Sequence, residues 1–350
     1  MTPKILLVGT GITTALTSIC LNKTLSEVCI VIWDKARGIG GRMSTSRPKS
    51  SSENNSTVDL GAQYITSTNE TISANYDIYE SLLTEKILEP MKCTILGMKP
   101  QKENVKNFIA AKGSSSIVKH FLQKSDNNIC FNHHINSISK LGKKWVVTTT
   151  LGTKDEFDIV ILTMPIPQIL QLQGSIKDIL LNEPDVLNKL ESVSYYSRYA
   201  LGLFYDNNSL KDIKWDAQYF VDDPVFRYIA IDNKKRQVKN IPDTVVIHTT
   251  KEFGQQYLEE ALPNMESKLM TCFKERFPSW PEPNSVKCHK WRYSQVSNSY
   301  PGSPGFITIS EDPILIAGGD GFRGSTFDNC VFSAKSITRE IQKLVGQNKS

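Results

Sequence analysis

The 350-residue sequence predicts an α/β protein, α+β overall, whose two domains interrupt one another along the chain. Three observations predict this class. The chain opens with a short apolar run and a glycine turn, and it closes with a second such pair. Its middle alternates polar and apolar residues as the strands of an antiparallel sheet do. We therefore expect a parallel-sheet domain with an inserted antiparallel-sheet domain.

Composition indicates a globular chain and excludes several classes. Hydrophobic residues make up 39% and charged residues 22%, so the chain lacks the apolar depletion of disordered proteins. No apolar run approaches the roughly 18 residues that a membrane span needs. Seven cysteines without CxxC pairing indicate reduced thiols and no disulfide scaffold or zinc site. The net charge is +5 and its tightest basic cluster, residues 234–236, reads as a solvated face, so we expect no nucleic-acid binding.

The first predicted element is a βαβ unit. The apolar strand KILLV (residues 4–8) runs into the turn GTGITT (residues 9–14) and a helix, and a second strand over residues 28–33 ends in Asp34. Glycines let the backbone close on a pyrophosphate at the helix N-terminus, and the terminal acid reaches a ribose. The unit therefore predicts a Rossmann-like dinucleotide site. Thr14 replaces the third glycine of the usual motif, and a glycine turn of another α/β protein is the alternative.

A second glycine-rich loop follows Asp34 directly. Residues 35–43 (KARGIGGRM) place Gly40 and Gly41 just before Arg42, whose planar, permanently charged guanidinium suits a pyrophosphate. A plain NAD domain has no need of such a loop, whereas flavin enzymes with two dinucleotide folds do. The loop therefore predicts FAD as the cofactor, with a flexible surface turn as the alternative.

The segment DLGAQY (residues 59–64) predicts a short strand with a glycine in its middle. Such a glycine marks the close approach of a ligand or of another backbone. In flavin enzymes of this class the segment passes the flavin ring and leaves Gln63 and Tyr64 facing the active site. A plain core aromatic is the alternative for Tyr64.

The centre of the chain predicts the remaining strands and the inserted domain. Strands are expected at 131–139, 144–149, 158–167 (stopped by its two prolines), 198–204, 218–221, 226–231 and 245–250, and a helix at 257–277. The FAD-binding domain is expected to comprise residues 1–75, 110–167 and 290–350, and the substrate domain residues 76–109 and 168–289. Trp291 either walls the cavity over the flavin or belongs to the core, and His248 either points into that cavity or is structural.

The C-terminal region predicts a last strand at residues 313–317, followed by the turn GGDG (residues 318–321). A helix then opens at Ser325–Asp328, with an apolar stripe at helical spacing. Asp320 can accept hydrogen bonds from ribityl hydroxyls. The positive end of the helix dipole then points at the pyrimidine end of the flavin, where charge appears on reduction.

Blocks along the whole chain resemble the FAD-containing amine-oxidase-like flavoproteins. These blocks are residues 31–35, 40–43, 59–66, 158–174, 194–205, 231–236 and 318–322. The departures are Thr14 and a loop at residues 47–55. The resemblance is to a branch of these flavoproteins that oxidises the 2- and 6-dihydro isomers of NAD(P) to β-NAD(P)+ and passes the electrons to O2, which forms hydrogen peroxide. It implies noncovalent FAD, because the chain has no SGGC-type cysteine.

The motifs and the resemblance together imply two sets of site residues and no metal. The expected cofactor contacts are Gly9, Gly11, Thr13, Asp34, Lys35, Gly41, Arg42, Gln63, Tyr64, Ile135, Gly319, Asp320, Thr326 and Phe327. The residues expected to line the cavity and orient the substrate are Gln63, Tyr64, Tyr219, His248 and Trp291. Hydride transfer from a dihydropyridine needs no general base or nucleophile, so no acid–base residue is required.

Two other functions and two locations stay open. The enzyme alternative is an amine oxidase that acts on catecholamines. The other is an extracellular signalling ligand, which would contact a cell-surface partner through residues 226–242. The resemblance implies secretion with an uncleaved N-terminus, because the first strand and turn are needed for the cofactor. The absence of a classical signal peptide and the unpaired cysteines favour a cytoplasmic location instead.

Overall fold

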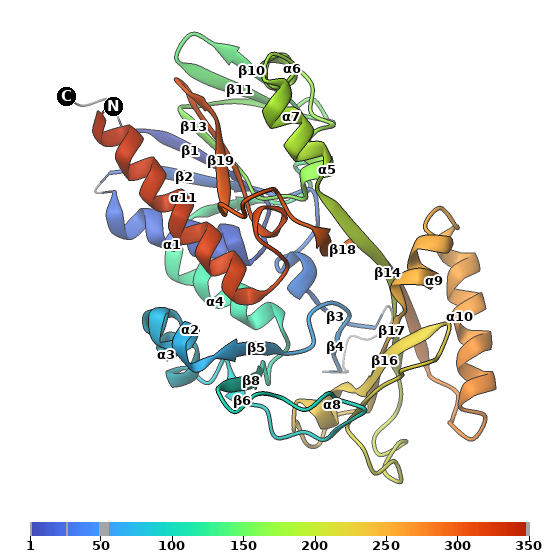
Figure 1. Cartoon of the computed structure of the whole chain (residues 1–350). Helices are drawn as coiled ribbons and strands as arrows, with labels where there is room; N and C mark the ends of the chain where they lie inside the picture. The colour runs from blue at the N-terminus through green and yellow to red at the C-terminus, as the bar shows by residue number, and fades with distance from the viewer. Residues whose placement is uncertain (1, 26, 49–55, 348–350) are drawn as a thin grey trace. The chain divides into compact units, whose positions relative to one another are not determined.

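The computed structural model describes residues 2–25, 27–48 and 56–347, which form two compact units (Figure 1). Unit 1 comprises residues 1–41, 118–195 and 295–350, and unit 2 comprises residues 42–117 and 196–294. Most of the loop that departs from the family pattern, residues 49–55, lies outside the described residues. The predicted domains are defined by which ligand they bind, cofactor or substrate, whereas the two units are defined by compactness. The predicted domain boundaries therefore stay a prediction.

Unit 1 is built on a six-stranded sheet in the order β19-β20-β13-β1-β2-β9. All neighbours pair in parallel except β19, which is antiparallel to β20. The strands are β1 (Lys4–Val8), β2 (Cys29–Trp33), β9 (Asn128–Cys130), β13 (Ile159–Leu162), β19 (Phe306–Glu311) and β20 (Ile314–Gly318). The unit also holds a three-stranded antiparallel sheet of β10 (Ile135–Leu141), β11 (Lys144–Thr149) and β12 (Lys154–Phe157). In the six-stranded sheet, strands β1, β13 and β20 are buried on both faces, as their continuous apolar sequences predict.

Two long helices of unit 1 pack against each other and against the parallel sheet. They are α1 (Ile12–Thr24) and α11 (Phe327–Gln347), which lie side by side in Figure 1. The other helical segments are α4 (Ser115–Ser125), which begins in unit 2, α5 (Ile166–Ile169), α6 (Ser175–Leu181), α7 (Pro184–Glu191) and η2 (Asp320–Phe322). The apolar stripe predicted for the last helix is confirmed, because every member is buried: Val331, Ala334, Ile337, Ile341 and Leu344.

Unit 2 is built on a second six-stranded sheet in the order β18-β14-β17-β16-β15-β7. The strands are β7 (Ile95–Leu96), β14 (Ser194–Phe204), β15 (Ala217–Tyr219), β16 (Phe226–Ile231), β17 (Thr244–Thr249) and β18 (Ser285–Asn298). Smaller sheets pair β3 (Thr45–Ser46) with β4 (Val58–Asp59), and β5 (Ile65–Thr68) with β8 (Val105–Ile109) and β6 (Glu89–Pro90). The helical segments are η1 (Gly41–Met43), α2 (Asn69–Ala74), α3 (Tyr76–Thr84), α8 (Asp232–Lys235), α9 (Lys251–Gln256) and α10 (Leu262–Arg276).

Both faces of the central strands in unit 2 are buried, and their residues alternate between two cores. Leu201, Ile229 and Ile247 pack with Met265 and Leu269 of α10. The alternate positions of the same strands pack around the segment at residues 58–60. This alternation brings the second face of β16 and β17 to the segment predicted to face the flavin.

The predicted α/β architecture is confirmed, with three local corrections. Residues 59–64 do not form one strand, since β4 ends at Asp59 and β5 begins at Ile65. The strand expected from residue 131 begins at Ile135, and the helix expected from residue 257 begins at Leu262. The helix starts late because residues 257–260 close separate turns and Pro263 occupies the first turn of α10, where proline is favoured. None of the helices in the described part of the chain is both long and apolar enough to cross a membrane.

Candidate functional site

The first glycine turn lies between the end of β1 and the start of α1. Gly9 has φ +110°, a conformation that favours glycine, and its N–H donates to Trp33 O at 2.8 Å. The second glycine loop meets this turn, because Gly40 N donates to Thr10 O at 3.0 Å. A Cβ built on Gly41 would lie 3.6 Å from the Cα of Gly11. The two loops thus expose backbone without side chains at the N-terminus of α1, which is the shape that a pyrophosphate requires.

Asp34 links the same turn to the end of β2. Its Oδ2 accepts hydrogen bonds from the N–H and the hydroxyl of Thr10, both at 2.6 Å, and its Oδ1 accepts from Ala36 N at 2.7 Å. A carboxylate oxygen accepts two hydrogen bonds, so Oδ1 retains capacity for a ribose hydroxyl. Burial lowers the pKa of the neighbouring Lys35, against the opposing effect of Asp34.

Thr14, the departure from the glycine motif, is buried and bonded. Its hydroxyl pairs with that of Thr163 at 2.7 Å, and Thr163 Oγ1 donates to Val8 O at 2.9 Å. At the third position of the motif, hydrogen bonds between hydroxyls therefore connect α1 with the ends of β1 and β13. In the usual motif, glycine allows close packing of helix and strand at this position. Thr13 is also buried near this point.

The C-terminal glycine turn lies in the same unit. Gly319 has φ +109°, its N–H donates to Ser333 Oγ at 2.8 Å, and a Cβ there would lie 3.2 Å from Thr163 O. Asp320 is buried, and its Oδ2 accepts from the Ser325 hydroxyl at 2.6 Å. Thr163 thus lies near both the first glycine turn and the last.

The remaining predicted cofactor contacts of unit 1 have structural positions as well. Thr326 accepts a hydrogen bond from Asn329 N at 3.1 Å, as an N-cap residue of α11 does. Phe327 is buried at the first turn of α11, and Ile135 belongs to the apolar core beneath the sheet. The contacts of these three residues with a cofactor stay a prediction.

The remaining predicted site residues belong to unit 2 and gather around residues 59–64. Gly61 has no room for a side chain, because its Cβ would collide with the carbonyl oxygen of Arg42. Ala62 N donates to the same oxygen at 2.9 Å, and Arg42 Nη1 donates to Tyr293 O at 3.5 Å. The close approach that the glycine indicates is therefore made by another backbone.

The carbonyl of Leu60 joins two predicted cavity residues. It accepts from Trp291 Nε1 at 2.8 Å and from His248 Nε2 at 2.9 Å. Because a carbonyl oxygen only accepts, Nε2 carries the proton of the His248 ring. Burial lowers the pKa of His248 to about 4, so the ring is neutral at pH 7.

A tyrosine pair lies next to this group. The hydroxyls of Tyr64 and Tyr219 are 2.6 Å apart, and the Tyr219 ring packs on Tyr228 at 4.8 Å between centroids. Burial, and then the neighbouring Tyr64, raise the pKa of Tyr219, and burial raises that of Tyr228. The Tyr228 ring lies 5.9 Å from that of His248. The structure thus brings Tyr64, Tyr219 and His248 into one aromatic cluster.

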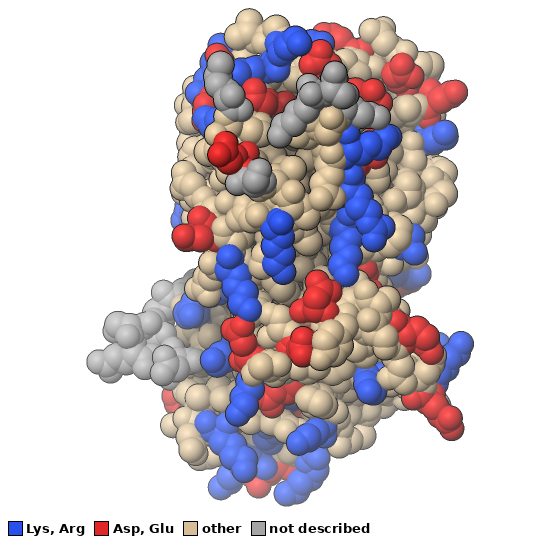
Figure 2. Space-filling model, turned by 90° about the vertical axis from the view of Figure 1, so that its left-hand side faces the viewer, with Lys and Arg blue, Asp and Glu red and all other residues tan. Residues whose placement is uncertain are grey.

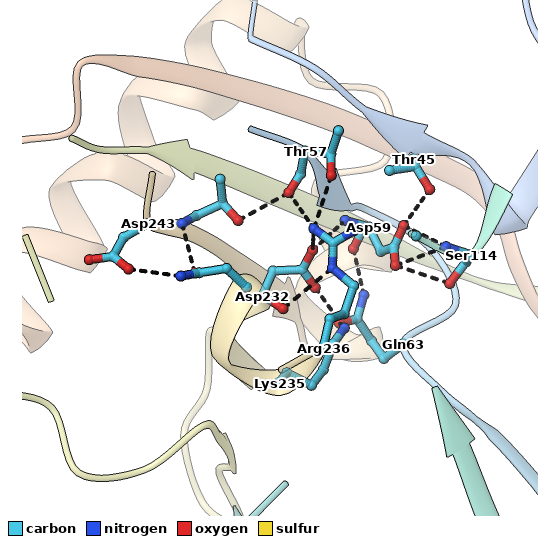
Figure 3. A network of polar contacts seen from close by, with 12 residues as sticks. Thr45, Thr57, Asp59, Gln63, Ser114, Asp232, Lys235, Arg236 and Asp243 are labelled. Carbon is cyan, nitrogen blue, oxygen red and sulfur yellow. Dashed lines mark hydrogen bonds and ion pairs between the residues drawn. The ribbon is translucent and has the colours of Figure 1, made fainter. Parts of the chain in front are cut away.

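Gln63 connects this segment to a buried charged network (Figure 3). Its Oε1 accepts from Lys235 Nζ at 2.7 Å, and its Nε2 donates to Asp59 O at 2.5 Å and to Gly61 O at 3.0 Å. Both amide hydrogens are engaged within unit 2. A contact between Gln63 and flavin or substrate would therefore use its remaining acceptor capacity or the edge of the side chain.

Sequence reasoning missed the charged members of this network. Lys235 and Arg236 are buried, so the solvated face expected for residues 234–236 is wrong. Lys234 is half-buried and donates to Leu210 O at 2.6 Å and to Ile213 O at 3.0 Å. Asp232 stands three and four residues before the two buried cations, a spacing that allows ion pairs on one turn of helix and could have indicated them. On the side of the molecule shown in Figure 2, exposed basic and acidic side chains are interspersed.

The arrangement in unit 1 defines a nucleotide-binding flavoprotein fold, and comparison with known proteins agrees. Residues 7–79 match the family described as NAD(P)-binding Rossmann-like domain. Residues 79–341 match the family described as flavin containing amine oxidoreductase. The chain belongs to the flavin containing amine oxidoreductase family, and it is a flavin-dependent oxidoreductase.

Within that family the sequence resembles renalase. The chain is 40% identical to renalase from Mus musculus over 347 residues, which cover 98% of this chain and 99% of the mouse protein. The fold is shared with a putative protoporphyrinogen oxidase from Exiguobacterium sp. 255-15, with a TM-score of 0.73, 13% identity and coverage of 97% and 99%. It is also shared with a putrescine oxidase bound to putrescine, with a TM-score of 0.69, 9% identity and coverage of 98% and 99%.

Proposed function

We propose that this protein is an FAD-dependent oxidase of isomeric dihydronicotinamide dinucleotides. Its substrates would be the 2- and 6-dihydro forms of NAD(P), its products β-NAD(P)+ and hydrogen peroxide, and its oxidant O2. The proposal rests on the resemblance to that branch of the family, which extends over the whole chain. The structural observation that supports it is the aromatic cluster of Tyr64, Tyr219 and His248, in which the His248 ring is neutral at pH 7.

The chemistry of the cluster agrees with hydride transfer. Bound FAD would supply a hydride acceptor and a route for two electrons to O2. A dihydropyridine becomes an aromatic cation when it loses a hydride, so the protein has to stack and orient the ring and has no proton to remove. At pH 7 the tyrosine hydroxyls with raised pKa values are protonated and the His248 ring is neutral. Such groups can orient an amide or a ring without exchanging protons with it.

The residues of unit 1 supply the proposed FAD site. The Gly9–Gly11 turn and Gly41 would take the pyrophosphate, Asp34 Oδ1 a ribose hydroxyl, and Asp320 the ribityl chain. We propose noncovalent attachment, since the cysteines are dispersed and lack the motif of covalent flavoproteins. Secretion with an intact N-terminus and a cell-surface partner stay predictions of the resemblance.

The test is anaerobic reduction of the bound flavin. Purified protein with its flavin is mixed without O2 with 6-dihydro-NAD, and in parallel with dopamine, while the oxidised flavin absorbance is followed. We expect rapid bleaching by 6-dihydro-NAD, followed on admission of O2 by one hydrogen peroxide per substrate. Bleaching by dopamine alone would overturn the proposal in favour of an amine oxidase. A purified protein without flavin absorbance would contradict the FAD site itself.

A further inference from the structure

A short helix in unit 2 carries two cations that are shielded from solvent. The side chains of Asp232 and Lys235 are 0% exposed, and that of Arg236 is 2% exposed. Lys235 Nζ lies 2.7 Å from Asp232 Oδ1, and Arg236 Nη2 lies 2.8 Å from Asp232 Oδ2. Buried charges are costly unless they are paired, so their retention here requires a specific partner arrangement.

The two cations have different second partners. Arg236 Nη2 donates to the carbonyl and hydroxyl oxygens of Thr57, at 2.7 and 3.0 Å, and so anchors the chain before β4. Lys235 Nζ donates instead to Gln63 Oε1 at 2.7 Å. Figure 3 shows both contacts at the side of α8 that faces residues 57–63. The ammonium of Lys235 is thus directed at one side-chain amide.

The contact with Lys235 fixes which way the Gln63 amide points. With Oε1 turned to the ammonium, Nε2 donates to the carbonyls of Asp59 and Gly61. Those two carbonyls flank the Leu60 carbonyl that holds His248 and Trp291. An amide turned by 180° would place NH2 against the ammonium and lose all three hydrogen bonds. Lys235 therefore sets the geometry of the turn on which the aromatic cluster depends.

The other end of this turn is held by a second carboxylate. Asp59 accepts from the Thr45 hydroxyl at 2.6 Å and from Ser114, and its N–H donates to Asp232 Oδ2 at 3.2 Å. Burial and then the neighbouring Asp232 raise the pKa of Asp59. Burial by itself would also raise the pKa of Asp232, but Arg236 and Lys235 outweigh it and lower that pKa. Asp232 therefore stays ionised and keeps Lys235 in place.

We propose that Lys235 is a positioning residue of the oxidase, which orients residues 59–64 through the Gln63 amide while Asp232 holds its charge. This inference rests on the proposed function, because the geometry that it fixes is that of Tyr64, His248 and Trp291. It also gives the basic motif at residues 234–236 a role inside the fold. The side chains of Lys235 and Arg236 are buried in the folded protein, so a binding partner could not contact them there.

The test compares Lys235→Met with Lys234→Met in the flavin-loaded, full-length protein. Methionine keeps most of the length of the side chain and removes its charge. Lys234 lies on the same helix as Lys235, but it donates to the unrelated carbonyls of Leu210 and Ile213. The first readout is hydrogen–deuterium exchange of the amides of residues 59–64. The second is the rate constant of anaerobic flavin reduction at saturating 6-dihydro-NAD.

We expect Lys235→Met to lose exchange protection at residues 59–64 and to reduce flavin about 10- to 100-fold more slowly, with little change in KM, because misplacement of reacting groups by about 1 Å costs this much. Lys234→Met should match the wild type in both readouts. Gln63→Met, which leaves the ion pair intact, should lose the same protection and is decisive if Lys235→Met does not fold. The double variant should be no worse than either single one.

Unchanged exchange at residues 59–64 in Gln63→Met, or in a folded Lys235→Met, would overturn the inference. Additive losses in the double variant would do the same, because they would mean that Lys235 does not act through Gln63. If the wild type fails to react with 6-dihydro-NAD, the proposed substrate is wrong. The exchange data still decide the positioning role in that case, because they do not depend on turnover.

Discussion

At the scale of single residues, His248 shows how burial sets the charge of a side chain in unit 2. Burial outweighs the hydrogen bond to Leu60 O and lowers the pKa of the ring from 6.5 to about 4. Burial, and then Lys287, lower the pKa of His289 to about 4 as well. Both rings are uncharged in the folded protein at neutral pH, although an unfolded chain would protonate them near pH 6.5.

The first prediction concerns stability in acid. Between about pH 6.5 and pH 4 the unfolded chain binds more protons than the folded one, so the free energy of unfolding falls as the pH falls. His248→Gln should reduce this fall by about 1–2 kcal/mol. One pKa unit corresponds to about 1.4 kcal/mol, and the full shift is discounted because solvent still reaches part of this half-buried residue.

Urea unfolding at pH 7.5, 6 and 4.5 measures the effect. The matched control is His134→Gln at an exposed position, which should keep the wild-type dependence on pH. Equal slopes for His248→Gln and the wild type would show that the His248 ring is not a source of the acid sensitivity.

At the scale of elements, α11 fixes the turn that follows β20. The Ser333 hydroxyl on this helix accepts from Gly319 N at 2.8 Å and donates to Gly305 O at 2.6 Å, and the side chain is 0% exposed. One helix residue therefore holds two glycine backbones that come from different loops. The position of Asp320, the next residue, depends on the first of them.

The second prediction follows from that contact. Ser333→Ala leaves the buried Gly319 N–H without its acceptor, which should lower the free energy of unfolding by about 1–3 kcal/mol. The same change should weaken flavin retention, because the turn before Asp320 loosens. Chemical unfolding and the flavin-to-protein absorbance ratio after dialysis measure the two effects. Ser336→Ala, one turn along the helix at a half-buried site, is the control and should retain both.

Elements with a strong local pattern could be predicted from sequence. Strands β1, β13 and β20 and the stripe of α11 are continuous or periodic apolar patterns, and their burial follows from those patterns alone. The segment at residues 59–64 could not be predicted as it is. Its shape depends on a contact with the backbone of Arg42, and the secondary-structure propensities of the sequence DLGAQY give no indication of that contact.

The candidate site divides in the same way. The glycine turns carry their own signature, since positive φ at Gly9 and Gly319 demands glycine. The sequence around the buried cations was misleading, because a run of Lys and Arg residues is usually exposed to solvent. The spacing of Asp232 is compatible with its ion pairs, but only the fold shows that Gln63 and Thr57 are the other partners of Lys235 and Arg236.

At the scale of the whole molecule, neither unit is a continuous piece of chain. Unit 1 takes three segments and unit 2 takes two, so the backbone passes between units four times. The proposed FAD contacts in unit 1 come from all three segments, with Gly9 and Asp34 in the first, Ile135 in the middle one, and Gly319 and Asp320 in the last. Thr163, from the middle segment, hydrogen-bonds to Thr14 of the first turn, and its carbonyl oxygen leaves little room for a side chain at Gly319 of the last turn. A ligand held by these turns would tie the ends of the chain together.

The last prediction is that FAD stabilises unit 1 across these distant segments. Flavin-stripped and reloaded full-length protein should differ in hydrogen exchange at residues 9–14, 34–41 and 318–327 together, while residues 144–157 of the neighbouring sheet change little. FAD at about 100 times its Kd should raise the free energy of unfolding by about 2.7 kcal/mol, because it binds only the folded state. Protection confined to one of the three segments would contradict a single dinucleotide that spans them, and would leave the other two segments with a structural role alone.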